Sequence, residues 1–341
     1  MIGSLPHTDP EQAVRLILEH LPEAPIWPEL PRRSFWEDMV HSHTDGLPCL
    51  VIDEQKQKMF VDTAGDCSVE LAAFYEKALA AEQEGELDKF AVTGRYASAL
   101  EPAAREIEKA GRFPVVKVQC IGPISFALGL DDSAGKPLYY DETFLDVLCR
   151  QVTLQSRWIA RRFKGYADEQ ISFLDEPSLA AFGSSGYLGV LRETVVEKLS
   201  VAVAALKEEG AVVGVHVCGN TDWSMIIESG FDLLNYDAYG YGPSMLIYAD
   251  ELKELFERGG VLAWGIVPNS EELLKETVES LEKRFFSLVD DLASRGIDRE
   301  LVLEQSMLTP ACGLGTLKPE VAERAMDLLS ALAEAVQTKV R

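Results

Sequence analysis

Short runs of branched apolar residues alternate with longer amphipathic segments along this 341-residue chain. Parallel strands joined by crossover helices give this pattern. Eight candidate strands cover residues 24–27, 48–52, 115–121, 171–174, 212–218, 232–236, 262–267 and 301–304. Helical spacing and good helix formers occupy residues 141–163, 188–209, 269–293 and 319–336. Eight strands in this length predict an α/β fold, a (β/α)₈ TIM barrel, although a doubly wound sheet has the same local pattern.

The chain shows no sign of division into domains. It has no linker rich in Gly, Ser or Pro, no low-complexity tract and no repeat other than the strand and helix alternation. We therefore expect residues 1–341 to form a single catalytic barrel with an elaborated N-terminal part. The least regular segments, residues 30–45 and 130–140, are predicted to be loops over the barrel mouth.

Composition restricts the partners and the compartment. The 32 basic and 56 acidic residues give a net charge of −24, which disfavours nucleic acid and anionic membranes as partners. No stretch is apolar enough for a membrane helix, and residues 1–7 lack the features of a signal peptide. Cys49, Cys67, Cys120 and Cys149 have no ligand spacing and are expected to be core or incidental residues. The six cysteines show no disulfide framework, so we predict a cytoplasmic protein.

The triplet His216-Val217-Cys218 ends one of the apolar runs. Alternate side chains of a strand share one face, so His216 and Cys218 can point at a single atom, and Cys312 offers a distant third ligand. Imidazole and thiolates suit Zn²⁺, and three protein ligands leave a fourth position open, as in catalytic zinc sites. The alternative is two buried thiols and a hydrogen-bonded core histidine. The position at a strand end, where α/β proteins carry their chemistry, favours the metal.

Acidic residues end two neighbouring candidate strands. Asp175 and Glu176 precede Pro177 at the end of one, in a position for catalysis, and the alternative is that Asp175 caps the next helix. Asp237 ends the strand that follows His216 and Cys218. It could be an oxygen ligand to the same metal, or it could only hydrogen-bond a neighbouring loop.

Ser4 and Glu29 could together hold a zwitterionic amino acid, one through its carboxylate and one through its ammonium. Alternatively, Ser4 caps the following segment and Glu29 pairs with Arg32 or Arg33 at the surface. The sequence has no dinucleotide-binding glycine motif, no P-loop lysine and no serine-hydrolase elbow, so nucleotide cofactors and serine hydrolysis lack support.

These residues together resemble the catalytic C-terminal half of cobalamin-independent methionine synthase, in the superfamily shared with uroporphyrinogen decarboxylase and methylcobamide:thiol methyltransferases. The similar motifs are Ile2-Gly3-Ser4-Leu5-Pro6, Leu174-Asp175-Glu176-Pro177, His216-Val217-Cys218 and Ala311-Cys312-Gly313-Leu314. The Gly219-Asn220 that follows Cys218 is closer to the cobamide:thiol methyltransferases.

The resemblance implies one Zn²⁺ per chain, held by His216, Cys218 and Cys312. Asp237 stands where the synthase has a glutamate ligand. It also implies homocysteine contacts, which fall at Ile2, Gly3, Ser4, Glu29 and Asp175.

The implied activity is methyl transfer to the thiol of homocysteine, forming methionine. The synthase also carries an N-terminal barrel that helps to bind polyglutamylated folate, and the resemblance covers only the catalytic half. With a net charge of −24, we therefore expect methylcobalamin or a methyl-corrinoid protein as donor rather than methyl-tetrahydrofolate. The alternatives are a methyltransferase acting on coenzyme M, a zinc-free lyase resembling uroporphyrinogen decarboxylase, and a non-catalytic corrinoid- or metal-handling protein.

Overall fold

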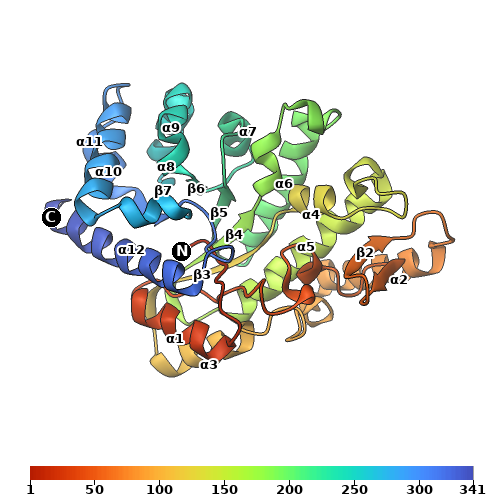
Figure 1. The fold of residues 1–341 in the computed structure, drawn as a ribbon. Helices are drawn as coiled ribbons and strands as arrows, with labels where there is room; N and C mark the ends of the chain where they lie inside the picture. The colour runs from red at the N-terminus through yellow and green to blue at the C-terminus, as the bar shows by residue number, and fades with distance from the viewer. Residues whose placement is uncertain (341) are drawn as a thin grey trace.

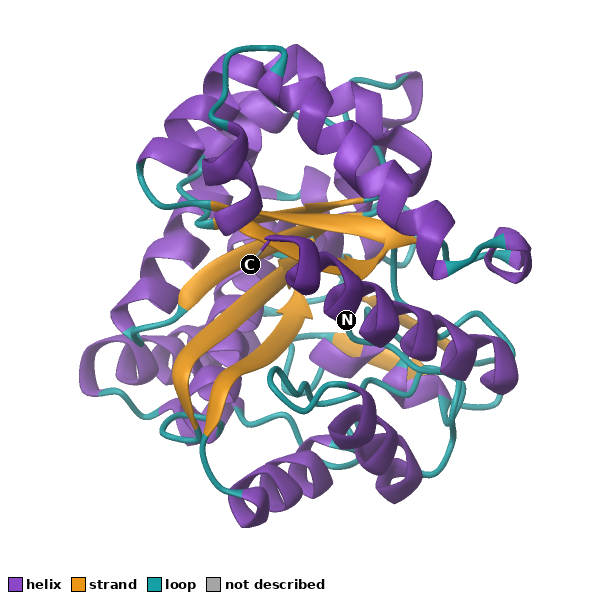
Figure 2. Ribbon diagram, turned by 90° about the vertical axis from the view of Figure 1, so that its left-hand side faces the viewer, coloured by secondary structure: helices purple, strands orange, loops and turns teal. Residues whose placement is uncertain are grey.

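A curved six-stranded parallel sheet forms the centre of the protein in the computed structural model, which describes residues 1–340 (Figure 1). The strands follow one another in chain order: β3 (Phe113–Ile121), β4 (Ala167–Asp175), β5 (Val212–Val217), β6 (Leu233–Tyr236), β7 (Val261–Val267) and β8 (Ser306–Pro310). Helices lie around the outside of this sheet, as Figure 2 shows. The α/β class is confirmed, and the arrangement is consistent with a TIM-barrel-like fold.

Eight regular barrel strands are not present in the described part of the chain. The predicted strand 24–27 makes only a single bridge, from Ile26 to Lys117 of β3. A second bridge joins Ser4 to Glu29, and Leu314 N donates to Ser4 O. Two extended segments thus connect the edge strand β3 to the residues after β8. Prolines at positions 6, 25, 28 and 31 explain their irregularity, because proline has no N–H to donate to a strand ladder.

Two other predicted strands were wrong in place or in type. Residues 48–52 overlap β1 (Leu50–Asp53), which pairs antiparallel with β2 (Lys58–Val61) in a separate two-stranded sheet. Residues 301–304 belong to the helix α11 (Arg299–Glu304) instead. The side chain of Asp298 accepts hydrogen bonds from Glu300 N and Leu301 N, which caps this helix, and the strand β8 begins only afterwards.

The long predicted helices are present. The described helices are α1 (Pro10–His20), α2 (Ser68–Glu84), α3 (Leu100–Ala110), α4 (Pro123–Gly129), α5 (Glu142–Arg162), α6 (Arg192–Glu208), α7 (Trp223–Glu228), α8 (Ala238–Tyr241), α9 (Ala249–Glu257), α10 (Val278–Ala293), α11 and α12 (Pro319–Val340). Short 3₁₀ helices occur within the predicted mouth loops 30–45 and 130–140. Within residues 1–340, no helix combines the length and the apolar character needed to cross a membrane.

Side chains from one face of the sheet fill its concave interior. Ile171, Phe173, Leu233 and Ala263 form a small apolar cluster there, separate from the larger core between sheet and helices. A cavity of about 620 Å³ lies beside this cluster, at the N-terminal halves of the strands. His216, Cys218 and Cys312 do not line it. The N-terminal halves of the strands are therefore lined mainly by apolar side chains, and the candidate site residues lie at the opposite, C-terminal ends.

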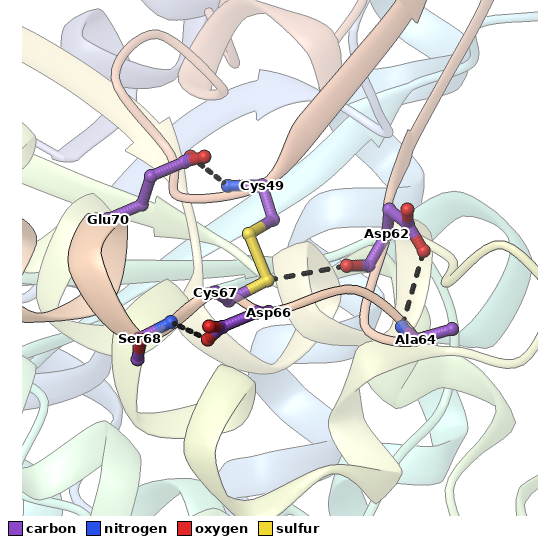
Figure 3. Close-up of a disulfide and its surroundings, with 7 residues drawn as sticks. All are labelled: Cys49, Asp62, Ala64, Asp66, Cys67, Ser68 and Glu70. Atoms are coloured by element: carbon purple, nitrogen blue, oxygen red, sulfur yellow. Dashed lines mark hydrogen bonds between the residues drawn. A yellow bond between two sulfur atoms is a disulfide. The ribbon is translucent and has the colours of Figure 1, made fainter.

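Cys49 and Cys67 form a disulfide, with their Cα atoms 5.9 Å apart (Figure 3). The bond joins the residue before β1 to the residue before α2, away from the parallel sheet. The interpretation of these two cysteines as core or incidental residues was therefore wrong. Spacing alone missed the bond, because the intervening hairpin brings together two residues that are 18 positions apart. The other four cysteines are free thiols.

We predict that the double substitution Cys49→Ala/Cys67→Ala lowers the free energy of unfolding by about 3 kcal/mol, because the bond restricts the unfolded chain. Chemical denaturation would measure this difference. A thiol reagent should detect four thiols in the denatured wild-type protein without reductant, and all six cysteines after reduction. Six reactive thiols before reduction would contradict the bond.

Candidate metal centre

His216, Cys218 and Cys312 converge at the C-terminal ends of the strands. One ligand atom from each residue lies within 4.8 Å of the ligand atoms of the other two, so the group could hold a metal ion. His216 Nε2 is 3.4 Å from Cys312 Sγ. His216 is buried and both cysteines are partly exposed, which gives the group an open side. The sequence named these three residues, and the structure brings them together.

Two local features place these side chains. His216 lies within β5 and Cys218 directly follows it, so the alternation of the strand puts both on the concave side. Cys312 follows β8, whose end lies against β7 at Gly265. A Cβ atom on Gly265 would be 2.4 Å from Tyr236 O and 2.8 Å from the Cα of Ala311, the residue before Cys312. Glycine is therefore required for the close approach that brings Cys312 to His216.

The sulfur atoms of Cys218 and Cys312 lie within 4.8 Å of each other, so each affects the ionisation of the other. The hydrogen bond from the Cys312 thiol, followed by the one with His216, lowers the pKa of Cys218. The same bond with Cys218, together with burial, raises the pKa of Cys312. The pair therefore favours one thiolate and one thiol sharing a proton. A metal cation would replace this proton, since thiolates are the form that binds metal.

Asp237 lies near this group but is not one of the three residues that converge. Its side chain accepts a hydrogen bond from Gly240 N at 2.7 Å and caps the short helix α8. Burial raises its pKa, backbone hydrogen bonds lower it, and the charge of Cys218 raises it further. The observed contact is the local hydrogen bond that the sequence left open as the alternative to metal ligation.

Asp175 and Glu176 are adjacent in sequence but differ in their hydrogen bonding. Glu176 is fully buried and accepts hydrogen bonds from Ile124 N at 2.9 Å and Ser125 N at 2.7 Å, in the first turn of α4. Asp175 ends β4 and is the register partner of His216 on β5. Asp175 is 4% exposed, and its Oδ1 has no hydrogen-bond partner. Glu176 therefore binds the N-terminus of α4, which precedes it in the chain, and neither acid caps the 3₁₀ helix that follows at Pro177–Ala181. Asp175 instead faces the centre with an unsatisfied oxygen.

The segment containing Ile2, Gly3 and Ser4 lies beside Glu29. Ser4 O accepts from Leu314 N at 3.0 Å, two residues after Cys312, and the Ser4 Oγ accepts from Gly315 N. A Cβ atom on Gly3 would be 2.7 Å from Glu29 Oε2, so glycine makes room for this carboxylate. Backbone pairing therefore brings Ser4 and Glu29 to the end of the sheet at which His216, Cys218 and Cys312 converge, and Glu29 is only partly exposed there.

Lys117 and Gln119 were not singled out from the sequence, yet they organise this region from β3. The Lys117 ammonium donates to Ile2 O and, at 3.2 Å, to Gln119 Oε1. Gln119 Nε2 donates to Trp27 O at 2.9 Å. The two side chains thereby hold both extended segments where regular ladder bonds are missing. The signal that could have found them is the presence of two long polar residues in the otherwise apolar run 115–121.

Lys117 also sets the charge beside the metal group. Burial and then the charge of Asp175 raise the pKa of Glu29 to about 8, and Lys117 opposes this rise. Burial raises the pKa of Asp175, while Lys117 and His216 lower it. Burial lowers the pKa of Lys117 to about 8, against the attraction of Asp175 and Glu29. Two carboxyl groups and one ammonium therefore share a desolvated region, in which an additional cation would favour ionisation of both acids.

We predict that the protein binds one Co²⁺, used as a spectroscopic probe, with the near-ultraviolet absorption of cobalt bound to thiolate. Cys218→Ser and Cys312→Ser should each weaken binding by more than about 100-fold, since even residues that only support ligands contribute 10- to 100-fold. Titration followed by absorbance would measure this. Cys149→Ser is the matched control, because Cys149 is a buried free thiol outside the group. Equal binding by all variants would contradict the assignment.

No family model matches the chain, and no curated protein matches it. Among solved structures, the chain is similar to a Listeria monocytogenes protein provisionally described as a vitamin-B12 independent methionine synthase, with a TM-score of 0.56. The match covers 97% of this chain and 86% of that chain at 13% sequence identity. At this identity, the similarity shows only that the two proteins share a fold. The candidate metal site rests on the convergence of His216, Cys218 and Cys312 in this chain.

Proposed function

We propose that this protein is a zinc-dependent methyltransferase that methylates the thiol of homocysteine and so forms methionine. The observation that carries the proposal is the convergence of His216, Cys218 and Cys312 beside the unpartnered carboxylate of Asp175. The similarity in fold to the Listeria monocytogenes protein supports the same class of reaction.

The three side chains fit zinc. With Zn–N near 2.0–2.1 Å and Zn–S near 2.3 Å, tetrahedral geometry puts the nitrogen and sulfur ligands roughly 3.6 Å apart. The distance from His216 Nε2 to Cys312 Sγ is 3.4 Å. One imidazole and two thiolates also form a borderline-soft donor set with a fourth position open. When bound, zinc would stabilise the deprotonated form of a substrate thiol, which is the nucleophile.

The charged residues around the centre suit the amino group of the substrate. Asp175 offers a buried oxygen without a partner, and burial, followed by the nearby charge of Asp175, raises the pKa of Glu29. An ammonium group between them would satisfy the oxygen and favour ionisation of both acids. Ser4 and the neighbouring backbone would hold the substrate carboxylate. Such positioning of the sulfur can contribute several kcal/mol to lowering the barrier.

A methyl-corrinoid is the donor that we favour. In the transfer, the sulfur lone pair forms the new S–C bond while the Co–C bond breaks, and its electron pair stays on cobalt as Co(I). No acid is needed, whereas methyl-tetrahydrofolate requires a proton on its leaving nitrogen. The net charge of −24 also disfavours a polyglutamate tail.

The two carboxylates favour homocysteine over coenzyme M as acceptor. The sulfonate of coenzyme M would lie among Asp175 and Glu29, where like charges repel. A zinc-free lyase resembling uroporphyrinogen decarboxylase would not require one imidazole and two thiols to converge, so their convergence argues against this alternative.

The proposal predicts methionine formation from homocysteine in an assay that offers methylcobalamin and methyl-tetrahydrofolate in parallel. The zinc-loaded protein should produce methionine with methylcobalamin and should not methylate coenzyme M at a comparable rate. Chromatographic quantification of methionine would measure this. Absence of product with both donors would contradict the proposed activity, and product with the folate alone would contradict the choice of donor.

We further predict that Asp175→Asn raises the KM for homocysteine by about 10- to 100-fold, since a hydrogen bond to a charged group contributes about 1.5–3 kcal/mol. Asp168→Asn is the matched control, because Asp168 is exposed near the start of the same strand β4. Steady-state kinetics would compare the two variants. An unchanged KM for Asp175→Asn would contradict the role of this carboxylate in binding the ammonium.

A further inference from the structure

Asn235 is a fully buried polar residue on β6, and it faces the concave interior next to His216. Its register neighbours are His216 on β5 and Ala263 on β7. The surroundings of Asn235 are partly apolar, because Leu233 lies two residues earlier on the same face of the strand. A buried amide without hydrogen-bond partners would therefore destabilise the fold. Every side of the Asn235 amide is instead hydrogen-bonded, which indicates a specific purpose.

The partners of the amide fix its orientation. Asn235 Nδ2 donates to Ala263 O at 2.9 Å and to Thr309 Oγ1 at 2.7 Å. Ala263 O is a carbonyl oxygen and can only accept. The Thr309 hydroxyl donates its own proton to Pro310 O at 2.9 Å, so toward Asn235 it also acts as an acceptor. Both protons of the amide nitrogen are thereby used, and the amide oxygen must face His216.

The amide oxygen in turn fixes the imidazole of His216. Asn235 Oδ1 is 2.5 Å from His216 Nδ1, and because this oxygen can only accept, the proton must be on Nδ1. The neutral imidazole then carries its lone pair on Nε2, the nitrogen that is 3.4 Å from Cys312 Sγ. We propose that Asn235 is a positioning residue that holds His216 in the Nδ1–H tautomer, ready to bind the metal through Nε2.

This inference rests on the proposed metal centre but makes a claim of its own about the metal-free protein. Outer partners of a metal-binding histidine fix its tautomer and ring orientation, and their loss typically weakens metal binding by 10- to 100-fold. Here the chain of hydrogen bonds begins at the backbone of β8 and ends at His216 Nδ1, the ring nitrogen opposite the proposed ligand atom Nε2. Because Thr309 is three residues before Cys312, the same strand end supports both ligands.

Nitrogen-15 NMR of the imidazoles tests the tautomer without any metal. The chain has five histidines, and a His216→Gln spectrum would assign the signal of His216. At pH 8, above the range where imidazoles ordinarily titrate, His216 should show the Nδ1–H tautomer in the wild-type protein. Asn235→Leu should give a mixture or the Nε2–H form. A wild-type spectrum of the Nε2–H tautomer would overturn the proposal.

Metal affinity provides the second readout. We expect Asn235→Leu to weaken Zn²⁺ binding by about 10- to 100-fold in competition with a chromophoric chelator. Asn235→Asp keeps an acceptor for Nδ1 and should retain tight binding. Thr309→Val removes one partner of the amide and should weaken binding in the same direction, which covers the case in which Asn235→Leu does not fold. Ser156→Ala is the control, since the hydroxyl of this buried serine donates to Val152 O within α5 and contacts none of the three metal-binding candidates.

The outcomes separate this inference from the proposed function. If the wild-type protein binds no Zn²⁺, the proposed function fails, whereas the tautomer in the metal-free protein is still decided by NMR. If the wild type binds Zn²⁺ and folded Asn235→Leu binds equally tightly, the positioning role of Asn235 is wrong and the metal centre stands.

Discussion

The contact between His216 and Cys312 depends on the curvature of the sheet. These residues belong to the ends of β5 and β8, which are three strands apart, so in a flat sheet the two strands would be separated by roughly 14 Å. Their ligand atoms are nevertheless 3.4 Å apart. Curling of the sheet, together with the close packing permitted by Gly265, makes this possible. The proposed chemistry therefore depends on the shape of the whole sheet as well as on the three side chains.

Polar side chains in the concave interior hold neighbouring segments together, a role that backbone hydrogen bonds between strands have in the rest of the sheet. Proline-rich segments replace two regular strands, and Lys117 and Gln119 secure them by hydrogen bonds to their carbonyl groups. The same lysine balances part of the charge of Glu29 and Asp175. Local support of the segments and the electrostatics of the candidate site are thus coupled through one side chain.

The sequence predicted what short-range pattern determines. The alternation of strands and helices gave the α/β class, and the spacing in His216-Val217-Cys218 gave two side chains on one face. Contacts between residues far apart in the sequence were harder to predict. The short apolar run at residues 301–304 fits a strand and a helix equally well, and the cap at Asp298 favours the helix. The Cys49–Cys67 bond and the support from Lys117 likewise depend on contacts between distant residues, which no local pattern reveals.

The alternation of β5 has a consequence for how such a chain can vary. A one-residue deletion within β5 before His216 would shift the strand by one position and turn both His216 and Cys218 toward the surrounding helices. The crossover helices and their loops can gain or lose residues without this effect. Natural variation in length should therefore be concentrated in the connections, while the five residues from Val212 to His216 keep their number.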